Sequence, residues 1–111
     1  SISVDYPRNF YMAQGYINDY AGETITVTDH EILDASFQLA ANTGIFTEPA
    51  SAAAFAGMLK YHQQDKLKPG TSNVVLLTGS GLKDIHAVQP LLNLPDPIEP
   101  EIAEIRTLLK L

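Results

Sequence analysis

The sequence predicts an α/β fold in which helices flank a small, mostly parallel sheet. Helical and strand-like segments alternate at short spacing along the 111 residues, which is typical of helices packed on parallel strands. Residues 73–77 form a continuous apolar run, as expected of a strand covered on both faces. Residues 24–27 are short and β-branched, which also favours a strand.

The first predicted helix spans residues 9–19 and precedes the strand at 24–27. Its apolar side chains recur at three- and four-residue spacing and form the helical stripe Phe10, Ala13, Ile17 and Tyr20. Gly22 separates the two elements.

A second helix is predicted from residue 28 to about residue 42. Thr28 and Glu31 have the spacing of a capping box, in which the threonine hydroxyl serves a free amide and the glutamate reaches back. Gly44 predicts the end of the helix, because glycine adopts a positive φ without steric cost. Residues 45–47 are short and apolar and predict a brief strand.

A third helix is predicted from Pro49 to about Gln64. Proline is tolerated in the first helical turn, where an N–H has no partner inside the helix. Small residues, mostly alanine, occupy many of the following positions. We expect them to permit close approach of other elements.

Beyond the apolar run, the sequence predicts a short helix within 85–94 that Pro90 interrupts. Three further prolines form a linker, and residues 101–111 predict an amphipathic helix. The predicted organisation is therefore a main segment over 1–94, followed by a proline-rich linker and terminal helix over 95–111.

The composition narrows the class of function. A formal net charge of −6 with scattered basic residues argues against a nucleic-acid partner, because phosphate neutralisation needs clustered Lys and Arg. No apolar stretch approaches the roughly 20 residues that span a bilayer, so no membrane partner is expected. The absence of cysteine and the spacing of the three histidines predict no thiolate chemistry and no metal site. A cytoplasmic location is the default expectation, since no signal-peptide pattern is present.

Thr78 is the strongest candidate for a binding residue on local grounds. It follows the apolar run 73–77, and ligands of open α/β sheets bind beyond the carboxyl ends of strands. Gly79 and Gly81 come next, and glycines let the backbone pass close to a ligand. A plain glycine turn explains the same residues equally well, because the spacing of a phosphate loop is absent.

Glu48 and Ser51 form a second candidate at the start of the third helix. A glutamate at a helix N-terminus interacts favourably with the helix dipole, so a purely structural role suffices for Glu48. In a functional role, its carboxylate would line a pocket at the edge of the sheet. Ser51 could contact an anion in the first helical turn or be an ordinary first-turn serine.

Two blocks of sequence carry a family resemblance. They are Glu-Pro-Ala-Ser-Ala-Ala at 48–53 and Leu-Thr-Gly-Ser-Gly-Leu-Lys-Asp at 77–84. Together they resemble the threonine synthase family of fold-type II pyridoxal-phosphate enzymes. The Gly-Leu-Lys-Asp ending is more similar to threonine synthases than to ammonia-lyases and racemases of the same fold type. Residues 1–94 would then be the C-terminal segment of the cofactor-binding domain, and the chain a C-terminal fragment.

The resemblance implies pyridoxal 5'-phosphate as the cofactor of the intact enzyme, which would convert O-phosphohomoserine and water to threonine and phosphate. In that family, the hydroxyl at the position of Thr78 hydrogen-bonds the pyridine nitrogen of the cofactor. A hydroxyl can donate to an unprotonated nitrogen, so the residue type fits. The implied cofactor-binding residues are Thr78 and Gly79, with Glu48 lining the pocket and Ser51 behind it. The expected partner is a phosphorylated amino acid, and a homo-oligomer stays open.

Two departures limit what the resemblance implies. The position of Ser80 is often histidine in the family, which leaves the substrate open. The family's Schiff-base lysine and glycine-rich phosphate loop have no match in the chain, so we expect no catalytic residue within it and no activity from the 111 residues alone. The alternatives are a related pyridoxal-phosphate enzyme, such as an ammonia-lyase or a cysteate synthase, and a non-catalytic α/β interaction domain.

Overall fold

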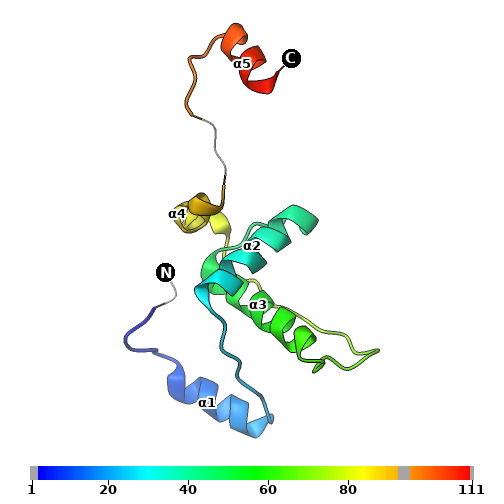
Figure 1. Cartoon of the computed structure of the whole chain (residues 1–111). Helices are drawn as coiled ribbons and strands as arrows, with labels where there is room; N and C mark the ends of the chain where they lie inside the picture. The colour runs from blue at the N-terminus through cyan, green and yellow to red at the C-terminus, as the bar shows by residue number, and fades with distance from the viewer. Residues whose placement is uncertain (1–2, 93–95, 111) are drawn as a thin grey trace.

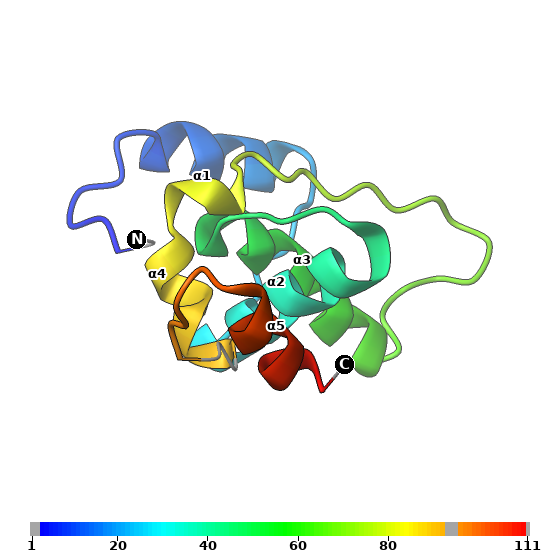
Figure 2. The ribbon, with the colours of Figure 1, turned by 90° about the horizontal axis from the view of Figure 1, so that it is seen from above.

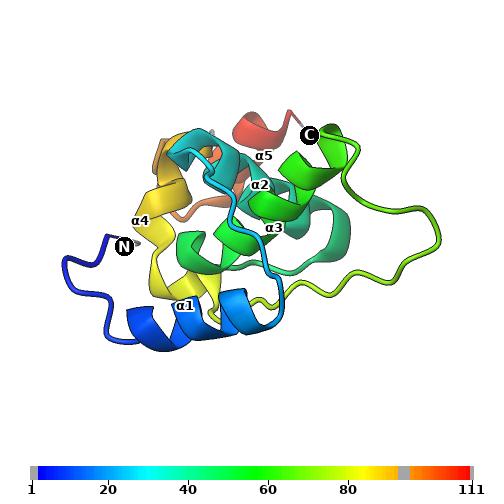
Figure 3. The same cartoon turned by 90° about the horizontal axis from the view of Figure 1, so that it is seen from below.

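Two crossing helices, α2 and α3, form the centre of the protein. The structure is a computed structural model that describes residues 3–92 and 96–110. Within these residues, the chain forms α1 (Phe10–Asp19), α2 (Asp29–Thr43), α3 (Pro49–Gln63), the 3-10 helix η1 (Gly81–Lys83), α4 (Ile85–Val88), the 3-10 helix η2 (Gln89–Leu91) and α5 (Ile102–Leu109). The helices α2 and α3 pack against each other, as Figure 1, Figure 2 and Figure 3 all show.

The predicted α/β fold is wrong, because the part of the chain that the structure describes contains no β-strand and no sheet. The strand expected at 45–47 is reduced to one isolated antiparallel bridge between Thr47 and Ser80. The segments 24–27 and 73–77 run singly, with no strand beside them among the described residues. A β-strand is stabilised by its paired neighbours, so an apolar run without such a neighbour is not enough to form one.

The exposure of residues 73–77 shows how the strand prediction failed. Val74 is 85% exposed and Leu76 is 74% exposed, whereas the alternate residues Val75 and Leu77 are partly covered. Figure 2 shows that the loop that contains this segment extends away from the helices. The prediction assumed that both faces of this segment are buried, whereas only the face of Val75 and Leu77 is partly buried.

α2 begins and ends as the sequence predicts. The Glu31 amide donates to the Thr28 hydroxyl at 3.2 Å, and the Thr28 amide donates to the Glu31 carboxylate at 2.6 Å, which confirms the capping box. Gly44 follows the helix with a φ of 75°, in the left-handed conformation that favours glycine. Pro49 occupies the first turn of α3, as predicted.

The capping contacts make the stability of the fold depend on pH through Glu31. The hydrogen bond from the Thr28 amide, followed by the contact with the Lys60 ammonium, lowers the pKa of Glu31 from 4.5 to about 2. A carboxyl with a depressed folded-state pKa stabilises the fold above its ordinary pKa, and this contribution is lost as the pH falls from 4.5 toward 2.

We expect Glu31→Gln to lower the free energy of unfolding at pH 7 and to change it much less below pH 2, in denaturant titrations. An equal loss at both pH values would contradict this assignment.

The core lies where α2 and α3 cross, and it is built largely from small side chains. Ala35 on α2 and Ala52 on α3 are 0% exposed, and Ala56 is 3% exposed. Ile32 completes the buried cluster. Because alanine adds only one methyl group to the helix surface, these positions let the two helices pack closely, as the small residues of α3 predict.

The segment that leads into α2 is held along α3. The Lys60 ammonium donates to the Thr26 carbonyl at 2.8 Å. Ile25 lies against Gly57, where a Cβ would come 3.1 Å from the Ile25 side chain. A helix therefore supports the segment that was predicted to pair within a sheet.

α5 lies apart from α2 and α3 (Figure 1). The radius of gyration of 18.9 Å exceeds the value of about 13 Å that a compact domain of this size would have. The helix carries the predicted apolar stripe of Ile102, Ile105 and Leu109, which is exposed. The predicted domain boundary after residue 94 falls in a stretch outside the described residues, so it stays a prediction. No helix of the described chain is long and apolar enough to cross a membrane.

Candidate functional site

Two loops that are distant in sequence meet beside the start of α3. The first covers residues 46–51 and runs into the first turn of α3, and the second covers residues 78–83 and includes η1. One backbone hydrogen bond between them runs from the Gly81 amide to the Phe46 carbonyl at 3.0 Å. We call these two loops and the contacts between them the latch.

Gly79 lies at the centre of the latch. Its carbonyl accepts hydrogen bonds from the Glu48 amide at 3.1 Å and from the Thr47 hydroxyl at 2.8 Å. Its amide donates to the Ser51 hydroxyl at 2.7 Å. Three of its neighbours in the other loop therefore fix its backbone on both sides.

The two glycines of the latch serve its closure. A Cβ at Gly79 would overlap the Glu48 carboxylate, and a Cβ at Gly81 would come 2.6 Å from the Phe46 ring. Neither glycine has a positive φ, so the requirement is one of space. From the sequence, we expected these glycines to let the backbone pass close to a ligand. In the structure, the chain's own side chains fill that space.

Thr78 and Ser51 face each other across the latch, with their hydroxyl oxygens 3.1 Å apart. Ser51 is 1% exposed, whereas Thr78 is exposed. Ser51 is therefore the buried member of this pair, and Thr78 is the exposed one.

Glu48 is held by a partner that sequence reasoning missed. Its carboxylate lies 3.0 Å from the Lys83 ammonium. The Lys83 side chain is 61% exposed, and an ion pair this open to solvent adds at most about 1 kcal/mol. Its main effect is to fix the direction of the Glu48 carboxylate. Lys83 lies in the second resemblance block, but nothing in the spacing of that block pointed to Glu48.

A buried serine connects the latch to α2. The Ser36 hydroxyl donates to the Thr47 carbonyl at 2.9 Å, and neither residue is more than 1% exposed. Sequence reasoning missed this support as well. The only signal was a serine on the apolar face of the second predicted helix.

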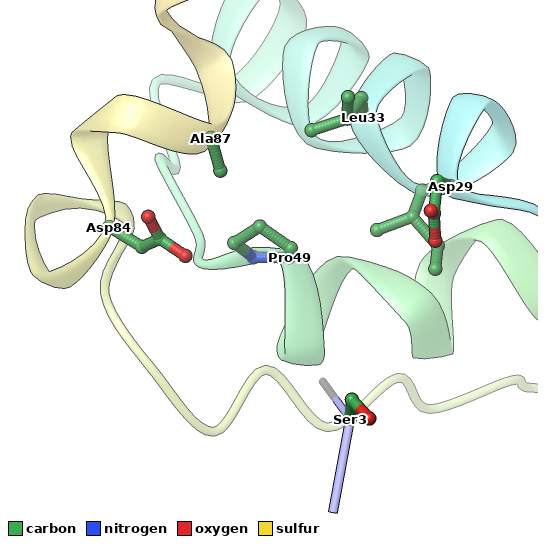
Figure 4. Close-up of a pocket in the computed structure, with 7 residues that line it drawn as sticks. Ser3, Asp29, Leu33, Pro49, Asp84 and Ala87 are labelled. Carbon is green, nitrogen blue, oxygen red and sulfur yellow. The ribbon is translucent and has the colours of Figure 1, made fainter. Parts of the chain in front are cut away.

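A hollow of about 310 Å³ opens beside the latch, between α2, α4 and the start of α3 (Figure 4). In Figure 4, Asp84 points toward Pro49 from the α4 side. The hollow is lined by Ser3, Asp29, Ile32, Leu33, Pro49, Asp84 and Ala87. The two charged groups among these described residues are carboxylates, which do not suit an anionic group such as phosphate.

The structure brings together all four predicted cofactor-binding residues. Thr78, Gly79, Glu48 and Ser51 contact one another within the latch. The reason given for Thr78 was its place at the end of a strand, and that reason fails with the strand. Hydrogen bonds between two loops gather these residues instead, and their role in cofactor binding stays a prediction.

Residues 1–79 match the family of pyridoxal-phosphate dependent enzymes, and this match includes all four predicted residues. The chain belongs to that family. This family assignment confirms the prediction that the intact enzyme uses pyridoxal phosphate as its cofactor.

Curated relatives of the chain include threonine synthases, which confirms the resemblance drawn from the two blocks. The chain is 46% identical to the threonine synthase of Synechocystis sp. over 84 residues, covering 76% of this chain and 22% of the relative. It is 34% identical to the threonine synthase of Methanocaldococcus jannaschii over 110 residues, covering 99% of this chain and 27% of the relative. The chain thus spans about a quarter of the length of the curated relatives it matches.

Proposed function

We propose that this chain supplies one wall of the pyridoxal-phosphate site of a threonine synthase-like enzyme. The Thr78 hydroxyl would donate a hydrogen bond to the ring nitrogen of the cofactor. The observation that carries the proposal is the hydroxyl of Thr78, an exposed residue, in contact with the hydroxyl of buried Ser51 within the sequence that matches the family. The bound cofactor supplies the electron sink for the chemistry.

The donor set of the latch fits a neutral pyridine ring. A hydroxyl donates to an unprotonated nitrogen, whereas a carboxylate at the same place would hold that nitrogen protonated. The carboxylate that the latch does contain, on Glu48, is paired with Lys83 and would border the site. Ser51 would support Thr78 from behind.

We propose that two other parts of the cofactor site, the phosphate-binding loop and the Schiff-base lysine, lie in sequence outside this chain. The latch presents a single ammonium, that of Lys83, and this group is engaged with Glu48. We assign the phosphate-binding loop and the Schiff-base lysine to the part of the relatives that the chain does not match. The 111 residues alone would therefore be inactive.

For the complete enzyme we propose a carbon–oxygen lyase that converts O-phosphohomoserine and water to threonine and phosphate. The test is to express the complete open reading frame that contains this sequence and to measure turnover with O-phosphohomoserine, phosphoserine, serine and threonine. Phosphate release from O-phosphohomoserine alone is the expected result. Turnover of serine or threonine would favour an ammonia-lyase, and turnover of phosphoserine with added sulfite would favour a cysteate synthase.

A second measurement on the complete protein tests the role of Thr78. We expect Thr78→Val to raise the dissociation constant for pyridoxal phosphate about tenfold, because one hydrogen bond to the ring is lost. Thr78→Ser keeps the hydroxyl and should bind within about twofold of the parent. Equal affinity of the valine and serine variants, measured by fluorescence titration, would contradict the assignment.

Exposed apolar side chains favour one other candidate, a non-catalytic interaction domain. They cluster on α1, where Phe10, Tyr11, Met12, Tyr16 and Tyr20 are all at least 51% exposed. Large apolar patches on a monomer mark interaction surfaces. A stable dimer of the 111-residue chain in analytical ultracentrifugation, together with an open reading frame that shows no turnover, would favour this alternative.

A further inference from the structure

We infer that Ser51 is a positioning residue whose hydroxyl donates a hydrogen bond to the Thr78 oxygen. This contact leaves the Thr78 hydroxyl to donate its own hydrogen bond toward a ligand. The inference rests on the proposed function for the identity of that ligand, an aromatic ring nitrogen without a proton. It goes beyond that function by assigning the direction of the hydrogen bond between the two hydroxyls.

The Gly79 amide sets the first constraint on this direction. An amide N–H can only donate, so the Ser51 oxygen accepts its hydrogen bond at 2.7 Å. The Ser51 hydroxyl then has one hydrogen left to donate. Within the described residues its remaining partner is the Thr78 hydroxyl, 3.1 Å away.

Burial sets the second constraint. Ser51 is 1% exposed, so solvent cannot accept its proton. If Thr78 donated to Ser51, the Ser51 proton would lie buried without an acceptor, which folded proteins strongly avoid. If Ser51 donates to Thr78, the Ser51 hydroxyl has a partner both as an acceptor, from the Gly79 amide, and as a donor, to Thr78. The second arrangement is therefore favoured.

The consequence falls on Thr78, which is exposed. Its oxygen accepts the hydrogen bond from Ser51, so its own hydrogen is not used toward Ser51. That hydrogen is thereby available for donation to a ligand. This is the polarity that an unprotonated ring nitrogen requires.

The test uses the complete protein that contains this sequence, loaded with pyridoxal phosphate labelled with ¹⁵N in the ring. The ring-nitrogen chemical shift reports its hydrogen bond directly and does not depend on turnover. The decisive variants are the isosteric pair Ser51→Asn and Ser51→Asp. Asparagine can accept from the Gly79 amide and donate to Thr78, whereas an ionised aspartate can only accept and would draw the Thr78 proton inward.

We expect the Ser51→Asn variant to keep the ring-nitrogen shift of the parent, and the Ser51→Asp variant to move it to the value of Thr78→Val. The cofactor dissociation constant of the aspartate variant should rise about tenfold. An aspartate variant with the parent shift would overturn the inference. A shift that is the same in the parent and in Thr78→Val would overturn the proposed function as well, which separates the two failures.

Ser51→Ala and Ser36→Ala provide a second comparison if the larger residues prevent folding. Each removes one buried serine hydroxyl bonded to the latch, but only Ser51 contacts Thr78. We expect both to lower the melting temperature and only Ser51→Ala to displace the ring-nitrogen shift. An equal shift in the two variants would show that Ser51 acts only through stability.

Discussion

Replacement of Ala52 by leucine is expected to lower the free energy of unfolding by about 3 kcal/mol, because it overfills the crossing of α2 and α3. Ala52 is 0% exposed and packs in one cluster with Ala35, which is also 0% exposed. The added side chain has to displace Ile32, the large member of that cluster, or separate the two helix backbones, and either change uncovers Ile32.

Ala54 provides the matched control for this prediction. It lies on the same helix, and its side chain is exposed. Ala54→Leu makes the same chemical change and should alter the free energy of unfolding by no more than about 0.5 kcal/mol. Urea titrations of both variants give the comparison. Similar losses in the two variants would show that helix propensity, and not packing at the crossing, controls the result.

Replacement of Gly81 by alanine is expected to cost about 2 kcal/mol, because the new methyl group would collide with Phe46. The Gly81 amide also donates to the Phe46 carbonyl at 3.0 Å, so the backbone cannot easily shift away. The latch would open at this end, and circular dichroism with urea would report the loss of stability.

A double mutant separates the collision from other causes. Phe46→Leu shortens the obstructing side chain, so Gly81→Ala should cost at least about 1 kcal/mol less in that background. Gly15→Ala is the control, since a Cβ at Gly15 meets nothing within 4 Å. In the interior of α1, that change should raise stability by roughly 0.5–1 kcal/mol. Additive effects of Gly81→Ala and Phe46→Leu would show that the ring is not the obstacle.

The helices could be predicted from the sequence because their signals are local. Thr28 and Glu31 satisfy each other over one turn, and Gly44 ends the helix through its own backbone conformation. Pro49 likewise begins α3 without help from distant residues. The sheet could not be predicted in this way, because a strand depends on a partner. The apolar run at 73–77 shows the composition of a strand and does not show what lies beside it.

The candidate site was predicted in part. Thr78 and Ser51 were named, and the structure places their hydroxyls 3.1 Å apart. Their contact could not be read from the sequence, because 27 residues separate them and no local rule joins two such loops. The support from Lys83 and Ser36 was missed for the same reason. Residue types suggested the chemistry, and only the fold could supply the pairings.

The latch has a consequence for the topology of the chain, which contains no cysteine. The bridge between Thr47 and Ser80 closes the intervening stretch, α3 included, into a ring without a covalent bond. A disulfide at the same place would constrain the unfolded chain as well as the folded one. Hydrogen bonds constrain only the folded chain, so they leave the unfolded chain open. When these hydrogen bonds break, the closure is lost, and it forms again only when two segments that are 32 residues apart at Thr47 and Gly79 meet.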